Sequence, residues 1–175
     1  MEDPAKEIDT VVRLVTGAMD PESQNAAALK YYAPDVTFRH PLSVVASAPD
    51  SRAELLAILD YYRIISPVIV HIVHVAYAAD TLTAYVDATQ TFHIRWSPFK
   101  PAPARFFIRF KLRPVPTPGE GTGTVYLIAE HEDFYHPDEL MALFVPPLAP
   151  LIRWGLRVGA WACGLNARVL EALGF

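Results

Sequence analysis

The chain has 175 residues, 52% of them hydrophobic and 19% charged, with a net charge of −4. This length suffices for one domain with its own core, and the composition excludes an intrinsically disordered chain. The acidic balance argues against a nucleic-acid partner, and the single cysteine excludes an intramolecular disulfide and a cysteine-built metal site.

Three helices are predicted in the first part of the chain. Apolar residues recur at helical spacing near the amino terminus. Asp20-Pro21 has the form of an N-cap followed by proline, and Ser51 to Glu54 has the pattern of a capping box. A short strand at 36–40 precedes the third helix. The expected helices are 5–18, 20–32 and 51–65.

Alternation of apolar and polar residues after Pro67 predicts four long strands. Helices followed by consecutive strands are typical of an α+β domain. We expect three N-terminal helices packed on a curved antiparallel sheet, forming a cone with a pocket, over residues 1–137. An apolar extension follows over 138–175. The expected strands are 68–78, 82–96, 105–113 and 124–135.

The extension has the clearest compositional pattern of the chain. Residues 140–152 carry no charge but three prolines, so they are too short and too interrupted to span a bilayer. From Leu151 onward three arginines fall in one narrow stripe at 100° per residue, and large apolar side chains cover the rest. This pattern predicts an amphipathic helix lying in the headgroup layer of a membrane or lipid droplet.

Two other partners for this helix stay open, namely its own sheet and a partner subunit such as a second copy in a homodimer. The segment 96–101 could form a second membrane contact, or it could be an ordinary rigid loop. The acidic amino terminus has no signal-peptide pattern, so a cytoplasmic protein is expected. The tail allows it to be peripheral on an intracellular membrane or lipid droplet. The predicted membrane contacts are Trp154, Trp161, Arg153 and Arg157.

One stretch of sequence resembles a known family. Residues 31–41, Tyr-Tyr-Ala-Pro-Asp-Val-Thr-Phe-Arg-His-Pro, are similar to a pattern of the NTF2-like superfamily in its SnoaL-like and ketosteroid-isomerase-like branch. Residues 134–137 are similar to the end of that family's last strand. With its apolar tail, the chain looks most like the fungal SigF-like NTF2-like proteins of unknown activity. The resemblance implies an NTF2-like cone around a small hydrophobic ligand (lipid, terpenoid or polyketide-like).

The resemblance also implies site residues. His40 stands where the isomerases carry the aspartate that moves a proton beside a carbonyl, and a histidine can act as a general base near neutral pH. It can equally donate a hydrogen bond and fill the pocket. Tyr32 matches a cavity tyrosine that would bond a substrate oxygen, with a place in the helix core as the alternative.

Alternation in the last strand puts Leu127, Ala129, His131, Asp133 and Tyr135 on one face. The resemblance turns this face inward, because Tyr135 then matches a cavity aromatic. His131 and Asp133 would orient or relay the proton, or simply bond each other. Phe92 and Phe110 are expected to line the pocket with Tyr135. The penultimate strand has no acid, so the isomerases' oxyanion hole is absent.

Two functions therefore stay open. One is binding of a hydrophobic ligand, with peripheral membrane association through the tail. The other is a cofactor-independent isomerase, cyclase or dehydratase with His40 as its base. No metal or organic cofactor is expected, because cofactor motifs are missing and His71 and His74, three apart in a strand, should point to opposite faces.

Overall fold

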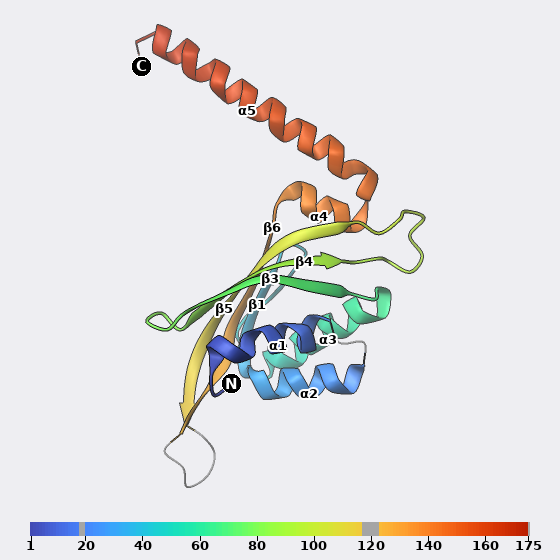
Figure 1. The fold of residues 1–175 in the computed structure, drawn as a ribbon, viewed down its shortest axis with the longest axis vertical. Coiled ribbons are helices and arrows are strands. Elements are labelled where there is room, and N and C mark those ends of the chain that lie inside the picture. Colours follow the sequence, from blue (N-terminus) through green and yellow to red (C-terminus); the bar gives the residue numbers. More distant parts are fainter. Residues whose placement is uncertain (18–19, 117–122, 175) are drawn as a thin grey trace.

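The computed structural model describes residues 1–17, 20–116 and 123–174. In this part of the chain, three N-terminal helices lie in the concave side of a curved six-stranded sheet (Figure 1). This confirms the predicted α+β cone. The helices are α1 (Pro4–Thr16), α2 (Pro21–Tyr31) and α3 (Ser51–Ile65). The strands are β1 (Tyr32–His40), β2 (Ser43–Val45), β3 (Ile69–Ala78), β4 (Thr83–Thr91), β5 (Pro103–Pro116) and β6 (Thr124–Tyr135).

The sheet is mixed rather than wholly antiparallel. Its strand order is β2-β1-β6-β5-β4-β3, and β1 runs parallel to β6. The chain leaves β1, crosses through α3 to β3 at the far edge, and returns strand by strand, so that β6 arrives beside β1 in the same direction. Because Phe38 is level with His131, the ends of β1 and β6 carry His40 and Asp133 to the same end of the sheet.

A β-bulge in β6 corrects the predicted alternation. Leu112 pairs with Ile128 while Lys111 pairs with Glu130, which leaves Ala129 as the extra residue. Ile128 is consequently buried together with His131, and the prediction that Leu127 and Ala129 face inward was wrong. The residues that follow the bulge keep the predicted inward phase.

The start of α3 also differs from its prediction. The N-cap is Asp50, whose φ of 63° lies in the left-handed region, and it makes no capping hydrogen bond. Ser51 instead donates from Oγ to the carbonyl oxygen of Val36 at 2.7 Å, which ties α3 to β1. The other predicted cap is confirmed, because Asp20 accepts a hydrogen bond from the backbone N–H of Ser23 at 2.8 Å.

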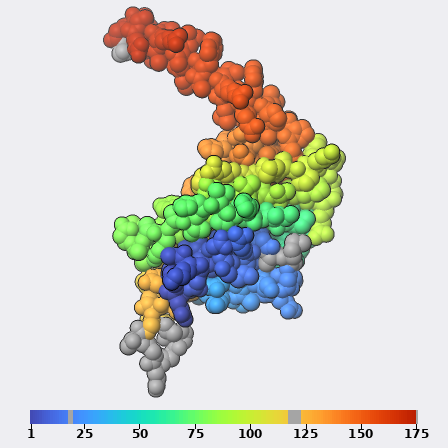
Figure 2. All heavy atoms as spheres, viewed as in Figure 1, coloured from blue at the N-terminus to red at the C-terminus, as the bar shows by residue number. Residues whose placement is uncertain are grey.

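The C-terminal segment divides into a packed part and a projecting part. Helix α4 (Pro137–Phe144) and a 3₁₀ turn (Pro146–Leu148) close one end of the cone, and Ala142, Leu143 and Ala149 are buried in a second core with Phe92. Helix α5 (Ala149–Ala172) projects away from the domain and is almost wholly exposed (Figures 1 and 2). Packing of this helix on its own sheet is therefore not what the structure shows.

Candidate functional site

A narrow cavity lies between the helices and the end of the sheet where β1 and β6 stop. Its volume is about 60 Å³. A buried water needs roughly 10–15 Å³ on this measure, so the space holds a handful of waters or one small molecule. Its walls are mostly apolar, and the aromatic members are Phe38, Tyr62, Phe92, Phe106, Tyr135 and Phe144.

A chain of hydrogen bonds ends at this cavity. The Tyr32 hydroxyl lies 2.9 Å from Nδ1 of His131, and Nε2 of His131 lies 3.0 Å from Oδ1 of Asp133. A carboxylate only accepts, so with His131 neutral its Nε2–H donates to Asp133 and its Nδ1 accepts from Tyr32. The His131 ring is 1% exposed and is held edge-on by Phe38 and Phe110. The ring orientation is thus fixed by packing as well as by its two partners.

Asp133 is the last member of this chain of hydrogen bonds, and it lines the cavity together with His131. Its second carboxylate oxygen makes no hydrogen bond within the described ranges. A carboxylate in apolar surroundings is costly unless it is paired or hydrogen-bonded, and His131 supplies one partner. The free oxygen can accept a hydrogen bond or a proton from a bound molecule.

His40 faces the same cavity from the end of β1. Its Nδ1 accepts a hydrogen bond from the backbone N–H of Leu42 at 3.2 Å, and its ring lies near those of Tyr62 and Tyr135. Burial lowers the pKa of His40 below its ordinary value, and the charge of Asp133 only partly opposes this. In a neutral ring whose Nδ1 accepts, the proton is on Nε2. His40 is then a hydrogen-bond donor toward the cavity.

The lowered pKa of His40 makes stability depend on pH. Unfolded His40 takes up a proton near its ordinary pKa of 6.5, while the folded form resists it. The stabilisation is therefore present above that pH and is lost as the pH falls below about 6.5 toward the lower pKa of the folded form, by at most about 1.4 kcal/mol per pH unit. Denaturant titrations should show a shallower pH dependence for His40→Gln. The exposed control, His136→Gln, should keep the wild-type slope, and an unchanged slope for His40→Gln would contradict the assignment.

The tyrosines of the cavity stay protonated. Burial, with a smaller contribution from the charge of Asp133, raises the pKa of Tyr135 well above 10. The Tyr135 hydroxyl accepts a hydrogen bond from Nε2 of Gln90 at 2.6 Å, and its own proton stays available as a donor. Burial likewise raises the pKa of Tyr62. The cavity thus presents phenol and imidazole donors opposite one carboxylate acceptor.

Comparisons with known proteins place this geometry in a family. A model of the SigF NTF2-like domain matches residues 1–175. The chain belongs to the SigF NTF2-like family. A search of curated proteins found no match. Many solved structures share the fold, and three of them show its range.

The first is a hypothetical protein with a ketosteroid isomerase-like fold from Catenulispora acidiphila DSM 44928, in complex with trimethylamine. It is 18% identical, with 79% of this chain and 92% of that chain covered and a TM-score of 0.58. The second is a putative SnoaL-like polyketide cyclase from Jannaschia sp. CCS1, at 17% identity, coverages of 82% and 94%, and a TM-score of 0.56. The third is the epoxide hydrolase/cyclase-like enzyme SalBIII, at 16% identity, coverages of 79% and 97%, and a TM-score of 0.53.

Two predicted residues of the SigF NTF2-like protein lie behind the cavity rather than in its wall. The Tyr32 hydroxyl donates to His131, and Tyr32 is not among the residues that line the cavity. Phe110 is buried against His131 and supports that ring from the side of β5. His40, His131, Asp133, Tyr135 and Phe92 line the cavity.

Sequence reasoning missed polar groups contributed by the helices. Gln24 is 3% exposed and lines the cavity, and its Nε2 donates to the carbonyl oxygen of Val15 while its Oε1 has no partner. Arg63 also lines the cavity with an unpartnered Nε. Gln24 could have been found, because it shares a helical face with Ala27, Ala28 and Tyr31. A bound molecule or water can satisfy both groups.

The described residues contain no group of His, Cys, Asp or Glu suited to a metal ion. His71 and His74 nevertheless share the outer face, because the register shifts between Ile72 and His74. The prediction that they point to opposite faces was wrong. Of the helices in residues 1–17, 20–116 and 123–174, none combines the length and hydropathy needed to cross a membrane. Arg157, Trp154 and Trp161 are exposed on α5, and Arg153 donates to Asp138 of α4 at 2.9 Å.

Proposed function

We propose that the cavity binds a small, largely apolar molecule (lipid, terpenoid or polyketide-like) that carries at least one hydrogen-bonding group. The observation behind this is the Tyr32–His131–Asp133 chain, which ends at a carboxylate that lines an aromatic cavity. In a buried network with a purely structural role, each donor and acceptor usually has a partner within the protein. Here one oxygen of Asp133, Oε1 of Gln24 and Nε of Arg63 are left for a bound molecule.

A second, wider space extends the cavity outward. An outer groove of about 450 Å³ is lined by Leu42, Ser43, Ile58, Tyr61, Tyr62, Ile65, Ile94, Trp96 and Phe144. Tyr62 and Phe144 line both spaces, so the two spaces adjoin at these side chains. A ligand larger than the inner cavity can place its polar end near Asp133 and its apolar body in the groove once these two side chains rotate.

The related structures support this proposal at the level of the fold. The Catenulispora protein holds trimethylamine, a small molecule with an apolar surface and one polar atom. The Jannaschia protein and SalBIII are described as cyclase-type proteins. Since the identities are below 20%, the ligand itself has to be argued from this cavity.

Saturation-transfer NMR with cyclohexanone, an apolar ring with one carbonyl, tests the binding proposal. Wild-type protein should give a signal that Thr16→Phe removes, because Thr16 lines the cavity and the larger side chain fills it. The matched control is Thr10→Phe, on an exposed position of the same helix, which should keep the signal. Equal signals from both variants, or none from the wild type, would overturn the proposal.

Acid–base catalysis of an isomerase, cyclase or dehydratase type is the second candidate function. It is favoured by one observation, the presence of an Asp133 carboxylate oxygen and a neutral His40 in the same cavity. The roles proposed for His40 and Asp133 are the reverse of those expected from sequence, where His40 was the base. Asp133 removes the proton, and His40 donates a hydrogen bond from Nε2 to the oxygen on which charge develops.

We also propose that α5 holds the protein on a membrane surface. Eight large apolar side chains of this helix are exposed, and its cations are arginines. A long helix with a narrow basic stripe and a wide apolar arc matches the pattern of interfacial helices. Vesicle flotation of a truncated protein tests this association.

A further inference from the structure

Exposed apolar side chains border the outer groove. Leu42, Tyr61 and Trp96 line it, and each is more than half exposed, Trp96 at 71%. They come from the β1–β2 turn, from α3 and from the loop 92–102, and no charged side chain is among the described residues that line the groove. Large apolar side chains gathered around one opening indicate a contact surface.

The ion pair at the base of α5 fixes which way the helix faces. Arg153 donates to Asp138 of α4, so the side of α5 that carries Arg153 is turned toward the domain. Arg157 and Arg168 lie on the same stripe at 100° per residue. The opposite, apolar side of α5 therefore faces away from the domain.

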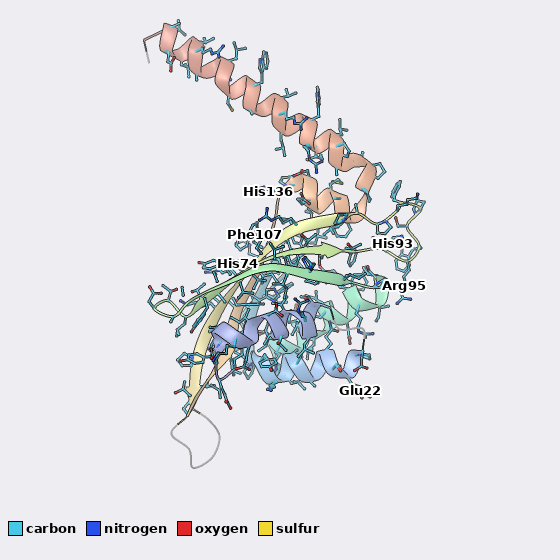
Figure 3. All side chains as sticks on the ribbon, viewed as in Figure 1. Glu22, His74, His93, Arg95, Phe107 and His136 are labelled. Carbon is cyan, nitrogen blue, oxygen red and sulfur yellow. The ribbon has the colours of Figure 1, made fainter. Side chains whose placement is uncertain are left out.

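The loop 92–102 and α5 can touch one flat surface. In Figure 1 the axis of α5, continued past its first residue, passes along the tip of the loop between β4 and β5. The rest of the described chain lies on one side of this line, as the space-filling view also shows (Figure 2). A flat surface that is viewed edge-on and follows this line would touch α5 and the tip of the loop. The rest of the domain would lie below that surface without crossing it. Figure 3 labels His93 and Arg95 where the loop begins, and Arg95 lies beside the end of α3, to which it donates hydrogen bonds.

The charge pattern indicates which kind of surface this is. Residues 88–119 and 140–170 contain nine lysines and arginines and no acid. Four of these cations are paired with acids of the domain, namely Arg105, Arg109, Arg113 and Arg153. The loop contributes Arg95 and Lys100 beside Trp96 and Phe99. Cations interleaved with large apolar and aromatic side chains match an anionic lipid surface, where the cations meet headgroups and the aromatics sit at the interface.

We infer that α5 and the loop 92–102 lie on the same anionic lipid surface, with the outer groove opening against it. This inference rests on the proposed membrane association of α5 and adds the orientation of the domain. Tyr62 and Phe144 then stand between the bilayer and the inner cavity. A ligand dissolved in the lipid reaches His40 and Asp133 without crossing water.

Tryptophan fluorescence tests the orientation, because the chain has three tryptophans, Trp96 on the loop and Trp154 and Trp161 on α5. The double variant W154F/W161F reports Trp96 alone, and W96F reports the helix alone. All three positions are exposed, so the variants should fold. The probe is anionic vesicles of phosphatidylglycerol and phosphatidylcholine, with and without bromine on the acyl chains. Brominated lipid should quench Trp96 to a degree comparable with the quenching of Trp154 and Trp161.

The two proposals fail in different ways in this experiment. Quenching of the helix tryptophans without quenching of Trp96 would overturn the shared surface and leave membrane binding by α5 intact. Absence of quenching at all three positions would overturn both proposals. Quenching of Trp96 that vanishes in neutral vesicles of phosphatidylcholine supports the role assigned to the cations.

Discussion

Deletion of residues 154–175 is expected to release the protein from anionic vesicles while the domain stays folded. The cut leaves the Arg153–Asp138 ion pair and the buried Ala149 in place, and the segment removed is nearly all exposed. Eight large exposed apolar side chains are lost. Even about 0.5 kcal/mol from each, well below full burial, is about 4 kcal/mol, which corresponds to roughly a thousandfold in partitioning. Flotation with vesicles measures the bound fraction.

A matched pair of point variants separates the apolar face of α5 from its charge. Trp161→Glu places an acid on the apolar arc, and Ala160→Glu places the same acid within the arginine stripe. Both positions are on an exposed helix, so the helix itself should tolerate either change. Trp161→Glu should weaken flotation far more than Ala160→Glu. Equal flotation of the two variants, or of the truncated and full-length proteins, would show that α5 does not dock through its apolar face.

Replacement of Asp133 by asparagine is expected to abolish proton abstraction in the cavity. The amide oxygen can still accept from Nε2 of His131, so the packing is kept while the base is lost. A positioned general base contributes about a hundredfold to ten-thousandfold in rate, and a loss of that size is expected. Ring opening of 5-nitrobenzisoxazole, which begins with removal of one C–H proton, measures this directly by absorbance.

The control for this experiment is Asp87→Asn. Asp87 is a carboxylate on the outer face of the sheet, where it pairs with Arg105. The Asp87→Asn variant should therefore leave the rate of ring opening unchanged. A wild-type rate no faster than that of acetate at matched carboxylate concentration would contradict the acid–base candidate and leave ligand binding untouched. A full rate for Asp133→Asn would remove Asp133 from the proposed role.

Much of the candidate site was predictable because of local periodicity. Alternation along residues 131–135 placed His131, Asp133 and Tyr135 on one face, and the resemblance supplied the direction of that face. The bulge at Ala129 does not affect this prediction, because these three residues come after the bulge in β6. Leu127 precedes the bulge, and its predicted inward direction was wrong.

Other members of the site could not be derived from sequence, since they depend on contacts between distant segments. Tyr32 was expected to reach a ligand, but its hydroxyl is taken by His131, 99 residues away along the chain. His40 was expected to act as a base. The donor role proposed here depends on the orientation of its ring toward the backbone of Leu42. Helix α4, which carries Phe144, was not predicted. It begins at Pro137, and a proline in the first turn is a signal for a helix start that was not applied here.

Spacing along single segments was enough to predict the α+β order of helices and strands, the basic stripe of α5 and the shared face of His131, Asp133 and Tyr135, because each depends only on side chains that follow one another in the chain. Three features became visible only in the folded chain: β1 lies parallel to β6, the Tyr32–His131–Asp133 chain forms, and α5 stands clear of its own sheet. These features depend on which distant segments of the chain come together in space. Many different arrangements are compatible with the same local spacing of side chains, and packing of the whole core selects among them.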